Sequence, residues 1–385
     1  EDAMSDTAIR PTPRSCVQTL APYVPGRPIE EVEAQYGIHG AVKLASNENP
    51  LGPSPKAVEA ATRALADVNR YPDGSGTFLK RAISARYGVP VGQIVLGAGG
   101  SELIDITVRT YVEPGDEVVV PQGIFRMFPV ATHRAGGALV EVPSPFAGLK
   151  PDLPALLRRI GEETKIVAIA NPNNPTGTYV SREELDWFVA RVPPGVLLFL
   201  DEAYFEFADE VVPDYPNGLA YLARGVPIVV LRTFSKIVGL AGLRIGYGFA
   251  AADVAAALEK VREPFNTTSV AQAAAIAALA DDEHRWKTRA LVVEERAFLF
   301  RELLLRGLSP WPSVANFLLV ETPVPFAPLE SEFARRGVIL RPMGAWGFPR
   351  GFRVSVGTHA ENLRFLGALD EIRAAGLLRG DGASR

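Results

Sequence analysis

One lysine of this chain lies among residue types that suit covalent chemistry. Residues 232–244 have the sequence R-T-F-S-K-I-V-G-L-A-G-L-R, in which Lys236 follows the hydroxyls of Thr233 and Ser235 and precedes Arg244. A lysine amine forms a Schiff base with an aldehyde only when it is deprotonated, so the site must let the cationic and neutral forms interconvert easily. Hydroxyls, backbone N–H groups and a planar guanidinium suit a phosphate dianion. The segment therefore predicts an anchor for a phosphate-bearing aldehyde cofactor, as in pyridoxal phosphate.

Two further segments carry partners for the ring of such a cofactor. A continuous apolar run at 196–200 predicts a buried parallel strand, and Asp201 follows it where the carboxyl end of the strand opens. An ionised Asp201 beside the ring nitrogen would keep the pyridine protonated, so that it draws electrons from the substrate. Asn174, from the stiff loop N-P-N-N-P-T-G at 171–177, and Tyr204 could donate hydrogen bonds to the phenolic oxygen. We therefore predict catalytic roles for the lysine, the aspartate and the tyrosine.

Three motifs in this order and spacing resemble those of the fold-type I aminotransferases. They are N-P-N-N-P-T-G at 171–177, D-E-A-Y at 201–204 and T-F-S-K-x-x-x-L-A-G-L-R-x-G at 233–246, and the resemblance covers nearly the whole chain. Within this group, L-A-P-Y-V-P-G at 20–26, L-A-S-N-E-N-P at 44–50 and R-Y-P-D at 70–73 resemble the histidinol-phosphate aminotransferase branch. The resemblance implies pyridoxal phosphate as cofactor. It also implies reversible transamination between histidinol phosphate or imidazole acetol phosphate and 2-oxoglutarate or glutamate.

The resemblance assigns further residues to the cofactor. The backbone of Gly99, Gly100 and Ser101, in a glycine-rich turn before a helix, would cradle the phosphate. Phe125 would stack on the ring, although its simpler interpretation is a core aromatic. Tyr71 would reach the phosphate of the neighbouring subunit's cofactor. The resemblance thus implies a homodimer with shared active sites.

Other residues would face the substrate. The resemblance places Tyr23 near the entrance and Asn174 in the pocket, with Arg341 and Arg353 at the anionic end of the substrate. A planar guanidinium fork binds a carboxylate or a phosphate equally well. Trp346 is a candidate wall of the pocket.

Each of these residues also has a simpler structural interpretation. A lysine after a strand is usually solvated, Asp201 alone would more often cap a helix or a turn, and Asn174 would bond its own backbone. Arg353 would pair with the nearby Glu361, and Arg341 with a surface carboxylate. The joint occurrence of the motifs favours the functional interpretation.

The bulk composition excludes several classes of partner. The chain has 385 residues, 47% of them hydrophobic, and a formal net charge of −4 with no basic stripe, so small molecules rather than nucleic acids are the expected partners. Its single cysteine, Cys16, and its four scattered histidines offer neither a disulfide nor a metal site. No apolar stretch approaches roughly 20 residues and no leader is recognisable, so we expect a cytoplasmic protein without a membrane span.

The order of apolar and helix-period segments predicts an α/β fold, with a mostly parallel sheet sandwiched by helices and a smaller α+β domain. We expect an N-terminal arm at 1–52 that contacts the partner subunit or the small domain, a large cofactor-binding domain at 53–262 and a small domain at 263–385. The expected strands of the large domain are 94–96, 117–120, 139–142, 166–169, 196–200, 228–231 and 245–249. Those of the small domain are 317–321, 338–341 and 352–356, after helices at 269–280 and 282–306.

Three other functions remain open at this point. An aromatic aminotransferase acting on phenylalanine or tyrosine would use the same arginine pair for a carboxylate. A pyridoxal-phosphate-dependent decarboxylase of an amino-acid phosphate shares the loop and lysine motifs. A non-catalytic sensor of the same fold would usually carry a DNA-binding domain, which this chain does not show.

Overall fold

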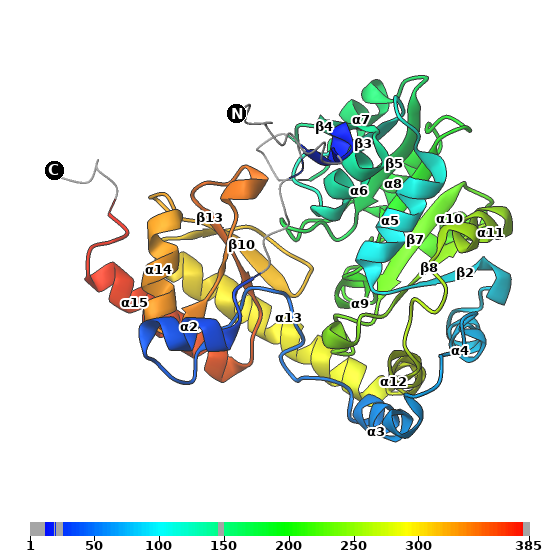
Figure 1. The fold of residues 1–385 in the computed structure, drawn as a ribbon. Coiled ribbons are helices and arrows are strands. Elements are labelled where there is room, and N and C mark those ends of the chain that lie inside the picture. Colours follow the sequence, from blue (N-terminus) through cyan, green and yellow to red (C-terminus); the bar gives the residue numbers. More distant parts are fainter. Residues whose placement is uncertain (1–11, 19, 21–25, 145–149, 380–385) are drawn as a thin grey trace, which may run out of the picture.

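The computed structural model describes residues 12–18, 20, 26–144 and 150–379. These residues form two lobes, and the long helix α13 (Asp282–Leu305) runs from the smaller lobe to the base of the larger one (Figure 1). No helix in these ranges combines the length and the apolar character that a bilayer crossing requires.

The larger lobe contains a seven-stranded sheet with the order β2-β8-β7-β6-β5-β3-β4, counted over the described residues. All neighbouring strands are parallel except β8, which is antiparallel to both β2 and β7. Strand β8 turns back because the chain after β7 forms the lysine-bearing loop instead of the helical crossover that a parallel strand needs. The strands are β2 (Ile94–Gly97), β3 (Glu117–Pro121), β4 (Ala138–Val142), β5 (Thr164–Ala170), β6 (Leu197–Asp201), β7 (Ile228–Thr233) and β8 (Gly246–Ala250).

Strand β6 shows why the sheet carries helices on both faces. Leu197 and Phe199 pack in the apolar cluster that includes residues of α5, α6 and α11, whereas Leu198 and Leu200 pack with residues of α8 and α10. A strand buried on both faces needs a continuous apolar run, which is what the sequence has. The helices of this lobe are α3 (Pro55–Ala64), α4 (Thr77–Tyr87), α5 (Gly100–Tyr111), α6 (Met127–Ala135), α7 (Leu153–Arg159), α8 (Arg182–Val189), α9 (Phe205–Ala208), α10 (Gly218–Ala223), α11 (Ala252–Val261) and α12 (Ser269–Leu279), with 3-10 turns η1 (Leu65–Asp67), η2 (Val91–Gln93) and η3 (Ala241–Leu243).

The smaller lobe contains an antiparallel four-stranded sheet with the order β12-β13-β10-β9, among the described residues. The helices α14 and α15 and the long α13 accompany it (Figure 1). Its elements are β9 (Ser309–Pro310), β10 (Phe317–Glu321), β12 (Arg341–Pro342), β13 (Gly351–Ser355), α14 (Ala327–Arg335), α15 (His359–Ala374) and the 3-10 turn η4 (Gly344–Trp346).

The strand expected at 338–341 is wrong as a single strand. The structure divides it into β11 (Val338–Ile339), which pairs with β1 (Val42–Lys43) of the N-terminal segment, and β12, which pairs with β13. Each piece is short because it pairs with a different strand, and each pairing extends over two residues only. These distant partners decide where each strand begins and ends.

The described part of the N-terminal arm contacts both lobes. Helix α1 (Ser15–Gln18) contacts α6 of the larger lobe, and α2 (Ile29–Tyr36) contacts α14 of the smaller one. The domain boundaries at 52 and 262 stay a prediction. Helix α12 packs on α3 and α4, which favours a boundary after α12 over one at residue 262.

Candidate active site

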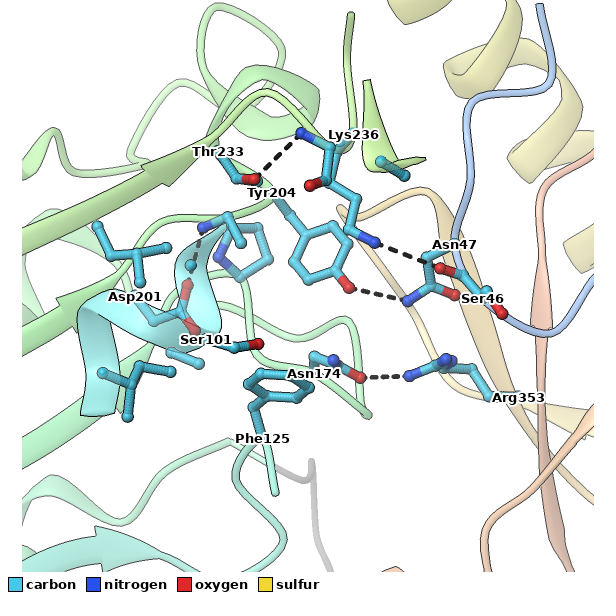
Figure 2. A pocket seen from close by; sticks show the side chains of 18 of the residues that line it. Ser46, Asn47, Ser101, Phe125, Asn174, Asp201, Tyr204, Thr233, Lys236 and Arg353 are labelled. Atoms are coloured by element: carbon cyan, nitrogen blue, oxygen red, sulfur yellow. Dashed lines mark hydrogen bonds between the residues drawn. The ribbon is translucent and has the colours of Figure 1, made fainter. Parts of the chain in front are cut away.

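One pocket gathers nearly all the side chains that the sequence singled out (Figure 2). It lies at the carboxyl ends of β5, β6 and β7, where parallel strands open in α/β sheets, and the smaller lobe closes its opposite side. The predicted residues that line it are Gly100, Ser101, Phe125, Asn174, Asp201, Tyr204, Thr233, Ser235, Lys236, Arg244, Arg341, Trp346 and Arg353.

Lys236 lies on the loop that follows β7 and is partly buried. Its Nζ donates a hydrogen bond to the backbone oxygen of Ser46 at 3.3 Å and lies 5.6 Å from the centre of the Tyr204 ring. Burial, and after it the charge of Arg353, lower the pKa of Lys236 to about 8, while the charge of Glu48 opposes the shift. A lysine in this state supplies neutral amine near physiological pH, which is the form that attacks an aldehyde. This is not the solvated surface lysine of the simpler interpretation.

Asp201 ends β6 on the floor of the pocket. Its Oδ1 accepts the backbone N–H of Ala203 at 3.0 Å, so the side chain also caps a turn. Burial raises the pKa of Asp201 to about 6, opposed by the Ala203 N–H and by the charge of Lys236. A buried carboxylate of this kind is stabilised in its ionised form by a nearby cation. A pyridine ring nitrogen that carries a proton would supply that cation.

The turn between β2 and α5 forms a cradle with Arg244. Gly99 has φ +81°, and a Cβ atom placed on it would lie 2.2 Å from Nη2 of Arg244, so only glycine allows the guanidinium this close to the backbone. Arg244 is held by the Ala241 carbonyl, to which Nη1 donates at 2.9 Å. The first amides of α5, the guanidinium and the Thr233 and Ser235 hydroxyls together fit a phosphate dianion.

Arg353 and Asn174 connect the two lobes inside the pocket. Nη1 of Arg353 donates to Oδ1 of Asn174 at 2.5 Å, and Nη2 donates to the Ala45 carbonyl at 2.9 Å. The predicted alternative of pairing with Glu361 is wrong, because Glu361 accepts from Thr358 at 2.8 Å as part of the capping box of α15. A buried guanidinium at the mouth of a cofactor site is suited to an anionic group of the substrate.

Arg341 and Trp346 form the remaining wall on the side of the smaller lobe. The guanidinium carbon of Arg341 lies 5.1 Å from the centre of the Trp346 ring, so the cation stacks near the aromatic face. Phe125 is half-buried and projects toward Asn174 and Ser101 from the opposite side (Figure 2). The pocket thus has aromatic walls formed by Trp346 and Phe125, and Arg341 lies against the first of them.

Tyr71 lies away from this pocket. Tyr71 is 84% exposed, and its ring stacks on Phe265 at 4.8 Å between centroids, so within one chain it does not reach the site. Tyr23 lies outside the described residues.

Asn47 is a pocket residue to which the sequence analysis gave no role. Its Nδ2 donates to the Tyr204 hydroxyl at 2.9 Å, and it is buried with φ +55°. Asparagine is one of the few residues that adopt this left-handed conformation readily. Its place in the motif at 44–50 was visible in the sequence, but its partners were not.

Comparisons with known proteins agree with this geometry. The family model described as aminotransferase class I and II matches residues 40–369. The chain is 48% identical over 360 residues to a histidinol-phosphate aminotransferase of Anaeromyxobacter sp. (strain Fw109-5), covering 93% of this chain and 98% of the relative. It is 45% identical to histidinol-phosphate aminotransferase 1 of Nitrosococcus oceani, covering 92% and 95%. A crystal structure of histidinol-phosphate aminotransferase from Sinorhizobium meliloti in complex with pyridoxal-5'-phosphate is 32% identical with a TM-score of 0.87, covering 97% of this chain and all of that one.

Proposed function

Because the chain belongs to the class I and II aminotransferase family and to its histidinol-phosphate aminotransferase branch, we propose that it transfers an amino group between histidinol phosphate and 2-oxoglutarate. The products are imidazole acetol phosphate and glutamate, and the cofactor is pyridoxal phosphate. The family, the enzyme class, the cofactor and the aspartate aminotransferase-like fold predicted from the sequence are confirmed by the family match and the structural neighbour. Membership in an enzyme family sets aside the non-catalytic sensor.

The observation that carries the proposal is the arrangement of charge across one pocket. A lysine whose pKa is lowered to about 8 faces a buried carboxylate on the side of the sheet. Two arginines, Arg341 and Arg353, lie on the side of the smaller lobe. The sheet side thus suits a cationic ring and an aldehyde, and the other side suits the anionic end of a substrate.

The bound cofactor supplies the electron sink that makes the Cα proton of an amino substrate acidic. Lys236 would hold the cofactor through its Nζ, and the same Nζ, when free, would act as base and acid for the proton at the substrate Cα. Asp201 would keep a proton on the ring nitrogen, and Asn174 and Tyr204 would donate to the phenolic oxygen.

The other side chains of the pocket hold molecules in position. Arg244, Thr233, Ser235 and the Gly99–Ser101 turn hold the cofactor phosphate, and Phe125 covers the ring. Arg353 and Arg341 hold the phosphate of histidinol phosphate in one half-reaction and a carboxylate of glutamate in the other, since a guanidinium fork fits both groups.

The Tyr71 side chain supports a homodimer with shared active sites. Tyr71 is 84% exposed and stacks on Phe265, which is 46% exposed. In a single chain this aromatic pair is in contact with water. We propose that it reaches the cofactor phosphate of the partner subunit. A cytoplasmic location likewise stays a prediction.

The pocket is also compatible with a second class of substrate, the aromatic amino acids. The aromatic walls formed by Phe125 and Trp346 would accept the ring of phenylalanine or tyrosine as well as an imidazole. The experiment supplies the loaded enzyme with 2-oxoglutarate and, in turn, histidinol phosphate, phenylalanine and tyrosine, and measures glutamate formed and carbon dioxide released. We expect the highest kcat/KM with histidinol phosphate and no carbon dioxide. Preference for an aromatic donor would establish the rival, and carbon dioxide release without glutamate would establish a decarboxylase.

A further inference from the structure

We propose that Asn47 is a positioning residue that turns the hydroxyl proton of Tyr204 toward the phenolic oxygen of the cofactor. The inference rests on the proposed function only in its use of pyridoxal phosphate and not in the identity of the amino donor. It concerns a residue of the N-terminal segment whose side chain is bonded to a residue of the turn between β6 and α9 (Figure 2).

The contact itself has a defined direction. Nδ2 of Asn47 donates to the Tyr204 hydroxyl oxygen at 2.9 Å, and both side chains are almost fully buried, at 1% and 5% exposure. A phenolic oxygen that accepts a hydrogen bond on one side donates its own proton in another direction. Tyr204 lines the same pocket as Lys236 and Asn174, and in our proposal its proton is directed at the phenolic oxygen of a cofactor bound there.

Ser355 fixes which end of the Asn47 amide faces Tyr204. The backbone N–H of Asn47 donates to the Ser355 Oγ at 2.8 Å, and that hydroxyl donates back to Oδ1 of Asn47 at 3.0 Å. Ser355 is buried, so its hydroxyl proton requires an acceptor, and Oδ1 provides one. With Oδ1 turned to Ser355, Nδ2 is the atom that meets the tyrosine.

The backbone of Asn47 is held as firmly as its side chain. It adopts φ +55°, and its carbonyl accepts from Nδ2 of Asn316 at 3.0 Å. Ser355 ends β13 and Asn316 precedes β10, so both supports belong to the smaller lobe. Asn47 is therefore fixed by two residues of the smaller lobe and is hydrogen-bonded to Tyr204 of the larger lobe.

This arrangement has a chemical consequence. A donor to the Tyr204 oxygen polarises the O–H bond and makes the tyrosine a stronger donor, because hydrogen bonds in a chain reinforce one another. A stronger bond to the phenolic oxygen favours its deprotonated form, and so lowers the pH at which the Schiff base between Lys236 and the cofactor loses its proton.

Two substitutions separate this role from simple packing. Asn47→Asp keeps the shape, tolerates the positive φ and still accepts from Ser355, but it offers Tyr204 an acceptor in place of a donor. Asn47→Gly also tolerates the backbone conformation and removes the donor without adding charge. Tyr204→Phe removes the receiving hydroxyl, and the two Asn47 changes combined with Tyr204→Phe complete the double-mutant cycles.

The measurement is the pH midpoint of the visible absorption band of the cofactor-loaded protein, recorded without any substrate. We expect Tyr204→Phe to raise the midpoint by about one pH unit, as the loss of one hydrogen bond to a charged group implies. Asn47→Asp, which turns the Tyr204 proton away, should raise it by a similar amount, and Asn47→Gly should raise it by less, because Tyr204 keeps its hydroxyl. Neither Asn47 change should shift it further in the Tyr204→Phe background. Thermal unfolding of each apo variant checks that the fold is kept.

Three outcomes would overturn the inference. An unchanged midpoint in Asn47→Gly beside a raised one in Tyr204→Phe would show that the amide does not act on the tyrosine. If Asn47→Asp shifts the pH midpoint equally with and without the Tyr204 hydroxyl, the aspartate acts through its charge alone. A visible band that is the same in Lys236→Ala as in the unchanged protein would overturn the cofactor assignment as well. Absence of turnover with histidinol phosphate would overturn only the proposed substrate.

Discussion

The guanidinium of Arg353 donates to the side-chain oxygen of Asn174 across the pocket at 2.5 Å, and this bond joins β13 of the smaller lobe to the loop after β5 of the larger one. Asn174 is also our proposed partner of the phenolic oxygen. Our proposed ligand of the anionic end of the substrate is therefore directly bonded to our proposed partner of the cofactor. Changes at Arg353 should consequently affect substrate binding first and the cofactor second.

Arg353→Lys should raise KM for both histidinol phosphate and 2-oxoglutarate. A lysine keeps the charge but not the planar fork, so it cannot bond Asn174, the Ala45 carbonyl and a substrate oxygen together. Loss of a bond to a charged group costs about 1.5–3 kcal/mol, which corresponds to about a tenfold to hundredfold fall in kcat/KM. Steady-state kinetics with each substrate measures it, and the exposed Arg350, changed to lysine, is the matched control. Unchanged KM values for both substrates would remove Arg353 from the substrate site.

Gly99→Ala should weaken binding of pyridoxal phosphate by about tenfold or more, because the new Cβ displaces the Arg244 guanidinium and the positive φ becomes strained. Binding of pyridoxal, which lacks the phosphate, should hardly change. Titration of the apo protein with both compounds measures the two affinities. Gly92→Ala is the control, since a Cβ there meets nothing within 4 Å. Equal losses for the two compounds would place the defect outside phosphate binding.

The pH dependence of cofactor capture should report the state of Lys236. Only the neutral amine reacts, so the rate at which apo protein bonds pyridoxal phosphate should rise with pH and level off above a midpoint of about 8, not 10.5 as for an ordinary lysine. Arg353→Met should move this midpoint upward, because the guanidinium charge is the second cause of the lowered pKa after burial. Stopped-flow absorbance over a pH series gives both values. A midpoint near that of free lysine would contradict the burial of the amine.

A mixture of two inactive variants tests whether Tyr71 completes the partner's site. Lys236→Ala and Tyr71→Ala homodimers should each have little activity, but a heterodimer contains one site with both the lysine and the tyrosine intact. Random reassortment should therefore restore about a quarter of the unchanged activity. Co-expression followed by an assay measures it, with Trp286→Ala, another exposed aromatic at 63%, in place of Tyr71→Ala as the control. Activity no higher than the sum of the separate homodimers would contradict shared sites.

The sequence predicted the sheet and the grouping of the lysine segment with Asp201 well, because both depend on local patterns. A strand buried on both faces must be continuously apolar, as β6 is, and Asp201 then comes at the carboxyl end of that strand by necessity. Lys236, Thr233, Ser235 and Arg244 lie within one short segment. Their proximity needed no knowledge of distant parts of the chain.

The parts that were missed depend on contacts between distant segments. Asn47 is hydrogen-bonded to Ser355, which is 308 positions away, and no local pattern indicates that pairing. The division of 338–341 into β11 and β12 likewise follows from partners at Val42 and Arg353. Such pairings are selected by packing across the whole fold and not by the intrinsic preference of the segment.

The most direct test of the proposed function is a single-turnover absorbance experiment on the cofactor-loaded enzyme, mixed separately with histidinol phosphate, glutamate, phenylalanine and tyrosine. The visible band of the lysine-bound cofactor should disappear rapidly with histidinol phosphate and with glutamate, as the amino group moves to the cofactor, and slowly with the two aromatic amino acids. Rapid loss of the band with phenylalanine or tyrosine, and little change with histidinol phosphate, would contradict the account.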